Sequence, residues 1–321
     1  MLYPWLQESF EQFHRAALAQ QLPHAIILQA CSGVGADSFA RAIAAMMLCE
    51  KKSPDQCGSC SSCQWYQAGS HPDLIELQCE QKSRVIKIDQ VRSLIERLNK
   101  TAYGKMQVGI IHHADSMNTA AANALLKTLE EPPGAVLLLL ISEKASSLPA
   151  TIRSRCQIST LSIQNREQAI AWLQSAYPDK NAETLYRHTL GSPLHASDLI
   201  ESGYFELRDR ILGFFCGHQK THNIVTFALE LSKETPSLSL KIMQSLIADL
   251  IKIHVNIAAE SLCHADRVHE LEELKQCSLV ADLQWFYQEL LSAKEQIEGK
   301  VHLNLQMVFE SLLLKWINVT K

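Results

Sequence analysis

Glycine is scarce in this sequence. It has 12 glycines in 321 residues, whereas soluble proteins average about 7% glycine. Scarce glycine favours helices over an architecture of many tight turns. Hydrophobic residues make up 47% and charged residues 20%, which excludes a wholly disordered chain. At roughly 150 residues per domain, the length predicts two or three domains.

The sequence also lacks a positive net charge and any segment typical of membranes or secretion. Its formal charge is -4, so no overall positive field would attract nucleic acid. Residues 1–13 contain Glu8 and Glu11 and no basic flank, which is unlike a signal peptide. The longest apolar run, residues 135–141, is too short to span a bilayer. We therefore expect a cytoplasmic protein without a membrane partner, in which the 10 cysteines do not form disulfides.

The first half of the chain alternates short apolar runs with helical patterns. Continuous apolarity over four to six residues is typical of strands buried on both faces. The predicted strands are residues 25–28, 74–77, 108–111 and 136–141, and the predicted helices are residues 38–48, 88–98 and 118–129. Alternation of this kind predicts an α/β domain with a parallel sheet.

The second half shows helical patterns and no further strands. Three short helices are predicted at residues 164–176, 180–190 and 194–200, and long ones include residues 238–257 and 303–317. We place domain boundaries near residues 162 and 206, so the predicted domains are 1–162, 163–205 and 206–321. The predicted fold class is α/β followed by all-α.

A glycine loop follows the first predicted strand, in the place of a phosphate-binding loop. The pattern G-x-x-x-x-G-K-[ST] uses its lysine to neutralise phosphates and its hydroxyl to hold magnesium. Here Gly33 and Gly35 are followed by Ala36 and Asp37. Asp37 adds a negative charge where the triphosphate would lie, so we expect no tight ATP binding. The simplest interpretation is a strand-to-helix turn with Asp37 or Ser38 as helix cap.

The second element of a nucleotide site is also altered. Paired carboxylates that organise magnesium are expected at the end of the strand 108–111. His112 and His113 stand there instead. Successive strand residues point to opposite faces, so we do not expect the two histidines to share a metal ion.

Four cysteines form the pattern C-x7-C-x2-C-x2-C: Cys49, Cys57, Cys60 and Cys63. Four thiolates at this spacing suit one tetrahedral zinc ion, and a closed four-cysteine site is structural rather than catalytic. An iron–sulfur cluster is the alternative, because it is also held by four thiolates. No redox motif accompanies the cysteines, which favours zinc. The serines around them (53, 59, 61 and 62) and Pro54 predict a loop.

Two arginines follow the last predicted strand, in the segment Ile152-Arg153-Ser154-Arg155-Cys156. Most arginines are solvated surface residues. An arginine in a loop beyond a sheet can alternatively reach a phosphate on a neighbouring subunit, as an arginine finger does. Spacing alone does not favour the second interpretation.

Together these motifs resemble the delta prime family of subunits of the bacterial DNA polymerase III clamp loader, which are AAA+ proteins. The resemblance rests on the altered glycine loop, the four cysteines, and the segments Leu22–Ala25, His71–Asp73, Asn123–Pro133 and Ser154–Cys156. It covers about the first 200 residues, and the remainder matches in its helical character.

The resemblance implies a RecA-like AAA+ domain with a zinc-binding insertion over 1–162, a small helical lid over 163–205, and a helical collar over 206–321 for oligomerisation. It implies gamma/tau ATPase subunits and a delta subunit as partners in a ring that loads the sliding clamp on primed DNA. It also implies that Arg155 acts in trans, on the ATP site of an adjacent subunit.

Three departures from the gamma/tau pattern decide which subunit type is expected. Ala36 replaces the lysine, His112 and His113 replace an Asp-Glu pair, and Leu194 replaces a sensor arginine. We therefore expect a non-catalytic stator subunit without intrinsic ATPase activity, within the DNA polymerase III holoenzyme. The alternatives are an active AAA+ ATPase subunit of the same complex and a zinc-dependent nucleic-acid-binding module.

Overall fold

The structure is a computed structural model that describes residues 2–51, 56–79, 85–189, 191–217, 223–234, 236–298 and 304–320. Two compact units divide the chain. The first comprises Met1–Ser175 with Gly191–Leu194, and the second comprises Ala176–Leu190 with His195–Lys321. Each unit is considered by itself below.

The first unit is built on a parallel sheet of five strands in the order β2-β3-β4-β1-β5. The central strands are almost wholly apolar because helices cover both of their faces; Ile27 of β1 pairs with Leu140 of β4, for example. The strands are β1 (Ala25–Gln29), β2 (Leu74–Leu77), β3 (Gln107–Ile111), β4 (Val136–Ser142) and β5 (Gln157–Thr160). The four strands that the sequence predicts are confirmed.

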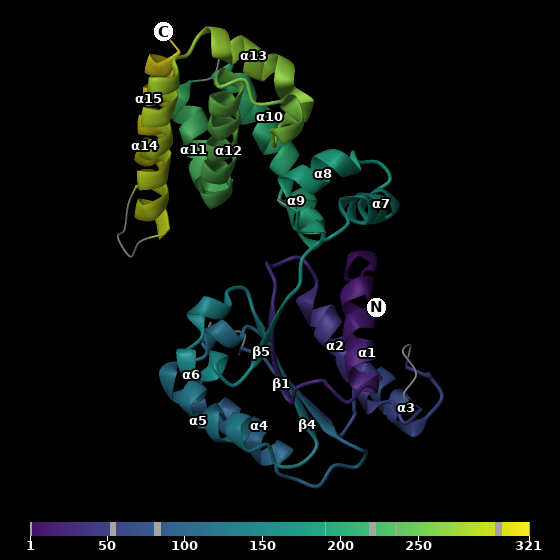
Figure 1. Ribbon diagram of the computed structural model, residues 1–321. Coiled ribbons are helices and arrows are strands. Elements are labelled where there is room, and N and C mark those ends of the chain that lie inside the picture. The colour runs from purple at the N-terminus through teal and green to yellow at the C-terminus, as the bar shows by residue number, and fades with distance from the viewer. Residues whose placement is uncertain are drawn as a thin grey trace. The chain divides into compact units, whose positions relative to one another are not determined.

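Helices pack on both faces of this sheet. Figure 1 shows α1, α2 and α3 on one side and α4, α5 and α6 on the other. The helices are α1 (Gln7–Leu18), α2 (Ala36–Leu48), α3 (Ser61–Gln67), α4 (Ile88–Leu98), α5 (Thr119–Glu130), α6 (Ala150–Arg153) and α7 (Arg166–Ala176), with short 3₁₀ turns at Pro4–Leu6, Ala114–Ser116 and Ala145–Ser147. This is an α/β domain with a parallel sheet, as the sequence predicts for the first half of the chain.

Local sequence signals set the ends of α5. The Asn118 side chain accepts a hydrogen bond from the Ala121 backbone N–H at 2.8 Å, which satisfies one of the free donors at the start of the helix. Pro132 and Pro133 follow soon after its last residue, and proline cannot continue a helix. The helix therefore ends beside Glu130, a residue that matters for the site.

Two local predictions were wrong. The strand β5 was not predicted, because Gln157, Ser159 and Thr160 are polar and the strand forms one edge of the sheet, where most of its side chains are exposed. Ser61 and Ser62, predicted in a loop, lie in the first turn of α3. The positions 53 and 54 of that predicted loop lie outside the described residues.

The second unit is helical, as predicted. Its core includes side chains from both sides of the expected boundary at residue 206: Leu199 and Tyr204 pack in the same cluster as Ile211, Phe286 and Trp316. Its helices are α8 (Ala182–His188), α9 (Ala196–Glu201), α10 (Tyr204–Phe215), α11 (Ile224–Glu234), α12 (Pro236–His254), α13 (Val268–Gln276), α14 (Val280–Glu298) and α15 (Leu305–Val319), with 3₁₀ turns at Ala259–Ser261 (η5) and Ala265–Arg267 (η6). A further 3₁₀ turn, Pro193–His195, begins in the first unit and ends in the second. The division of the chain at 162 and 206 stays a prediction.

The predicted fold class, α/β followed by all-α, is confirmed by these elements. Across the described ranges, none of the helices has both the length and the apolar character that crossing a membrane requires.

Candidate functional site

The glycine loop between β1 and α2 has the backbone of a tight turn. Gly33 and Gly35 have φ angles of 81° and 100°, in the left-handed region that glycine adopts without strain. Gly35 is itself the N-cap of α2 and no side chain caps that helix. The expectation that Asp37 or Ser38 provides the cap is therefore wrong, and the Asp37 carboxylate is available for another partner.

Aromatic and apolar groups of the first unit lie against this loop. The Trp5 indole N–H donates to the Val34 carbonyl at 2.9 Å, and the Leu194 backbone N–H donates to the Gly33 carbonyl at 3.2 Å. A methyl group placed on Gly35 would come within 2.6 Å of the Tyr3 ring, which itself stacks on Trp5 at a centroid distance of 5.0 Å. The loop is thus packed from within its own unit.

The Asp37 carboxylate pairs with His112. His112 Nδ1 lies 2.5 Å from Asp37 Oδ1, and its Nε2 lies 3.7 Å from Glu76 Oε2. Glu76 in turn accepts two hydrogen bonds from the Arg41 guanidinium, at 3.0 and 2.9 Å. We call Asp37, His112, Glu76 and Arg41 the charge network; it consists of two acidic and two basic side chains.

The groups of the charge network stay ionised near neutral pH. Burial alone would lower the pKa of His112, but its contacts with Asp37 and Glu76 raise it to about 9. Conversely, the contact with His112 lowers the pKa of Glu76 to about 2, against the effect of burial, and the same imidazole lowers the pKa of Asp37. The network therefore balances its own charges.

His112 and His113 diverge, as the alternation of strand residues predicts. His112 is buried, whereas His113 is exposed and has a φ of 49°, in the left-handed region. The end of β3 thus presents one protonated imidazole where a nucleotide site needs carboxylates for magnesium. Lysine is missing at position 36, and the first residue of α2 is a buried alanine.

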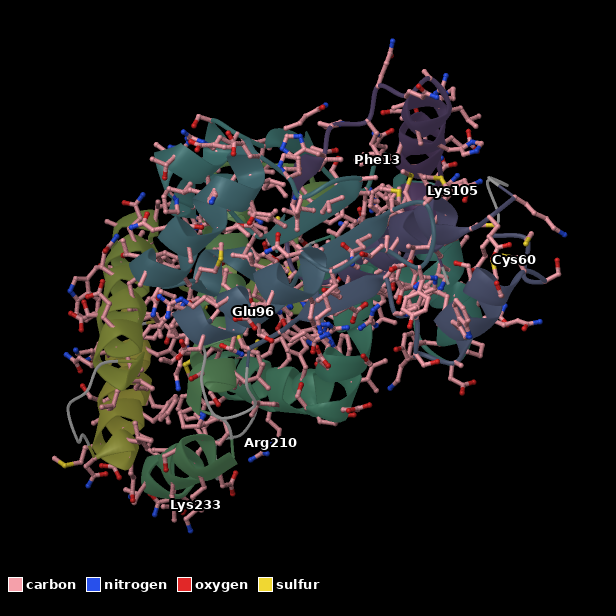
Figure 2. All side chains as sticks on the ribbon, turned by 90° about the horizontal axis from the view of Figure 1, so that it is seen from below. Phe13, Cys60, Glu96, Lys105, Arg210 and Lys233 are labelled. Atoms are coloured by element: carbon pink, nitrogen blue, oxygen red, sulfur yellow. The ribbon has the colours of Figure 1, made fainter. Side chains whose placement is uncertain are left out.

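The structure brings Cys49, Cys57, Cys60 and Cys63 together, with ligand atoms within 4.8 Å of one another. A tetrahedral zinc ion with Zn–S bonds of 2.3 Å separates its sulfurs by about 3.8 Å. The Cys57 and Cys63 sulfurs are 3.9 Å apart. Figure 2 labels Cys60 near the right edge of the view. The side chains of Cys49, Cys60 and Cys63 are nevertheless buried. The four side chains therefore fit one tetrahedral ion.

Hydrogen-bond donors approach several of these sulfurs, although burial raises the pKa of the Cys63 thiol to about 12. The backbone N–H of Cys57 donates to Cys49 Sγ and that of Cys63 donates to Cys60 Sγ, both at 3.4 Å. Hydrogen bonds from the Ser59 backbone N–H and hydroxyl lower the pKa of Cys57 to about 6. Because metal-bound cysteine is deprotonated, the donors at Cys57 favour metal binding, whereas Cys63 would have to lose its proton when a metal ion binds.

A buried chain of hydrogen bonds connects the cysteine segment to the sheet. The Ser62 hydroxyl lies 2.6 Å from His71 Nε2, and His71 Nδ1 accepts from the Asp73 backbone N–H at 3.0 Å. The Asp73 carboxylate accepts from the backbone N–H groups of Tyr103 and Gly104 at 2.9 and 2.7 Å. The His71-Pro72-Asp73 motif thus has a structural role: it fixes α3 against the residues that precede β2.

Arg155 lies between α6 and the edge strand β5, and its side chain is 33% exposed. Its Nε donates to Glu130 Oε1 at 2.8 Å, and its Nη2 makes a second contact with the same oxygen. Nη1 donates to the Thr151 carbonyl at 2.9 Å. The guanidinium is thus oriented by the end of α5, beside the edge of the sheet.

Sequence reasoning found Asp37, His112, Arg155 and the cysteines but missed how they are paired. Arg41, Glu76 and Glu130 were not singled out. Glu76 carried a signal, because a carboxylate inside the short apolar strand β2 needs a partner. Arg41 and Glu130 carried none, because charged residues on helices are ordinary.

Two family models match the chain. The model described as "DNA polymerase III, delta subunit" matches residues 5–165. The model described as "DNA polymerase III, delta subunit, C terminal" matches residues 204–318. The first match lies within the first unit and the second within the second unit, and residues 166–203 lie between them.

Individual relatives agree with these models. DNA polymerase III subunit delta' of Pseudomonas aeruginosa is 32% identical, with 99% of this chain and 98% of that protein covered. The Escherichia coli protein of the same name is 29% identical, with 98% and 94% covered. Among solved structures, a gamma subunit-related protein from Thermotoga maritima is 16% identical, with a TM-score of 0.44 over 97% of this chain and 99% of that one.

Proposed function

The chain belongs to the delta prime family of DNA polymerase III subunits, and we propose that it is a non-catalytic stator subunit of the clamp loader. In this role it completes an ATP site that belongs to another chain. It thereby helps to load the sliding clamp on primed DNA, and it has no ATPase activity of its own.

The observation that carries this proposal is the charge network. A working site needs a lysine for the phosphates and free carboxylates for magnesium. At Asp37 and Glu76, the carboxylates are engaged by His112 and Arg41. The region is therefore electrically balanced without a ligand. It offers neither the lysine that a triphosphate needs nor a free carboxylate for magnesium.

We propose that Arg155 acts in trans on the γ-phosphate of a neighbouring ATPase subunit. Its guanidinium is partly exposed and held by Glu130 rather than folded into a core. Its own chain has no competent triphosphate site, so a phosphate that it contacts must belong to a neighbour. A guanidinium is always charged and binds phosphate through two parallel hydrogen bonds.

Zinc is proposed as the ion held by Cys49, Cys57, Cys60 and Cys63. Four thiolates leave no open coordination position, so the ion would contribute folding energy rather than catalysis. We place the contacts with the gamma/tau and delta subunits on the C-terminal helices from about residue 206. These helices supply most of the core of the second unit, and the sequence from residue 206 contains no phosphate-binding motif.

Two measurements test the proposal. Isothermal titration of the isolated full-length chain with Mg-ATP should give no measurable binding, and steady-state turnover should equal a buffer blank. ATP turnover that copurifies with the chain and changes in a Gly35→Ala variant would contradict the non-catalytic assignment.

The trans role is tested in complexes reconstituted with gamma/tau and delta subunits. Arg155→Ala should assemble normally and depress both ATP hydrolysis and clamp loading, and Arg155→Lys should restore little of either. Arginine fingers are worth about 10³-fold or more at one site, but bulk turnover falls less because the ring has other ATP sites.

The matched control is Arg153→Ala. Arg153 is exposed and lies two residues from Arg155, so its removal takes away a similar charge and should leave both activities near wild type. If Arg155→Ala assembles and both activities equal those of the wild type, Arg155 is an ordinary surface residue.

A further inference from the structure

A second group of metal-binding side chains lies inside the second unit. His188 at the end of α8, and Cys263 and His264 between η5 and η6, have ligand atoms within 4.8 Å of one another. We propose that these three side chains form a second zinc-binding site, separate from the four-cysteine site and of a different ligand class.

His264 has a ring nitrogen that is free to bind a metal. Its Nε2 lies 2.9 Å from the Ser245 hydroxyl, and that hydroxyl donates its proton to the Ile242 carbonyl at 2.8 Å. The Ser245 oxygen must therefore accept from an Nε2–H, which leaves Nδ1 unprotonated. His264 is fully buried, and its Nδ1 has no hydrogen-bond partner within the described part of the chain. A buried nitrogen lone pair without a hydrogen-bond partner is unusual in a folded protein, and a bound metal ion would satisfy it.

The other two ligands have the spacing of a zinc site. The Cys263 sulfur lies 3.4 Å from His188 Nδ1. Tetrahedral zinc, with Zn–S and Zn–N bonds of 2.3 and 2.0–2.1 Å, places sulfur and nitrogen ligands about 3.5 Å apart. The two imidazole rings are 4.8 Å apart between centroids. One ion can therefore contact all three side chains once the Tyr204 hydroxyl, which lies 3.1 Å from His188 Nδ1, gives up that contact.

Carboxylates near the cluster offset the charge of a bound cation. Asp266 lies 4.0 Å from His188 Nε2, so a small shift would let it accept a hydrogen bond from Nε2–H when Nδ1 binds the metal, as outer carboxylates do in many zinc sites. Asp249 is fully buried and accepts from the His264 backbone N–H at 2.7 Å. The guanidinium of Arg208 lies 3.4 Å from His188 Nε2, but its Nη1 makes its shorter bond, 2.8 Å, to Asp266.

The ligand types suit a metal ion of the zinc class. Binding forms a Zn–S bond and releases the proton of the Cys263 thiol to solvent. Two imidazoles and one thiolate are ligands that zinc prefers, and the fourth position is left for a water molecule.

Metal analysis of the full-length chain provides the test. After saturation with ZnSO₄ and gel filtration, the wild-type chain should retain two zinc ions. Cys263→Ser and His264→Gln should each retain one, whereas the matched controls Cys277→Ser and His269→Gln, at exposed positions, should retain two.

A Cys57→Ser variant separates this inference from the proposal for the four-cysteine site. A wild-type chain with one zinc, lost in Cys57→Ser and kept in Cys263→Ser, overturns the inference and leaves the other site intact. One zinc with the opposite pattern supports the inference and overturns the four-cysteine site.

Cobalt spectroscopy keeps the test valid if a variant folds poorly. CoCl₂ added to the wild-type chain with zinc in the four-cysteine site should produce a thiolate-to-cobalt absorption band. The band should saturate at one equivalent, and one equivalent of ZnSO₄ should slow alkylation of Cys263 at least tenfold in the same chain. Absence of the band together with unchanged alkylation overturns the inference.

Discussion

The charge network predicts that part of the stability of the first unit depends on the protonation of His112. Its pKa in the folded chain is about 9, above the 6.5 of an ordinary histidine. A group whose pKa is raised by folding stabilises fully below its unfolded pKa, and this contribution is lost as the pH rises through the folded pKa. The stabilisation is therefore complete below pH 6.5 and disappears around pH 9.

The magnitude follows from the same two values. The difference between a pKa of 6.5 and one of about 9 corresponds to roughly 3 kcal/mol at 1.36 kcal/mol for each tenfold change. The partner carboxylate of Asp37 is 55% exposed, and solvent weakens such an ion pair. We therefore expect the protonation of His112 to contribute about 1–2 kcal/mol.

The perturbation is His112→Gln, which keeps a polar side chain but removes the charge. Urea unfolding should find the variant less stable than wild type at pH 6.5, and the difference should shrink by about 1–2 kcal/mol by pH 9.5. His188 and His264 do not disturb this comparison, because burial lowers the pKa of each and both stay neutral throughout the range.

Two results would refute the reasoning. One is a stability difference between His112→Gln and wild type that is the same at pH 6.5 and pH 9.5. The other is an NMR titration of the His112 ring with a midpoint near 6.5. The exposed neighbour His113 provides the control, because His113→Gln should change the pH profile much less.

Three further predictions concern the first unit. Gly35→Ala should lower the melting temperature more than Gly134→Ala, because both glycines have positive φ but only Gly35 faces the Tyr3 ring. Thermal unfolding should separate the two variants by a few degrees. Equal shifts in melting temperature would contradict the packing of the loop. Cys60→Ser should remove one zinc per chain, whereas Cys277→Ser should not, as elemental analysis can check. Asp73→Asn should cost about 1–3 kcal/mol in urea unfolding, because its carboxylate accepts two backbone N–H groups.

Much of the fold could be predicted because its signals are local. The strand Val136–Ser142 is buried throughout and apolar up to its last residue, so the continuous apolar run in the sequence is enough to predict it. The edge strand Gln157–Thr160 has no such signal, because pairing with β1 rather than burial of its side chains makes it a strand. The helix Ser61–Gln67 was hidden by its serines, although Cys60 caps it by accepting from the Cys63 backbone N–H.

The candidate site likewise has a part that local sequence predicts and a part that depends on the folded sheet. The four cysteines lie within 15 residues of one another, so their spacing was sufficient to predict a shared ligand. The charge network depends on strand pairing: Glu76 lies opposite Ile110, and the His112 N–H donates to the Leu77 carbonyl at 2.9 Å. Sequence alone identified Asp37 and His112 as departures from a nucleotide site, but the contact between them exists only in the folded sheet.

The charge network also explains why the two departures belong together. In a working nucleotide site, a lysine and magnesium offset the triphosphate, and the carboxylates are satisfied by the metal. Without cationic partners, Glu76 would be an unpaired carboxylate that is only 25% exposed, which is costly; Asp37 is 55% exposed and would lose less. His112 and Arg41 supply those partners from within the chain. A lysine restored at position 36 alone would therefore meet a network already neutral, with a protonated imidazole where magnesium should bind. The charge network is paired without a ligand, which supports the proposed non-catalytic role.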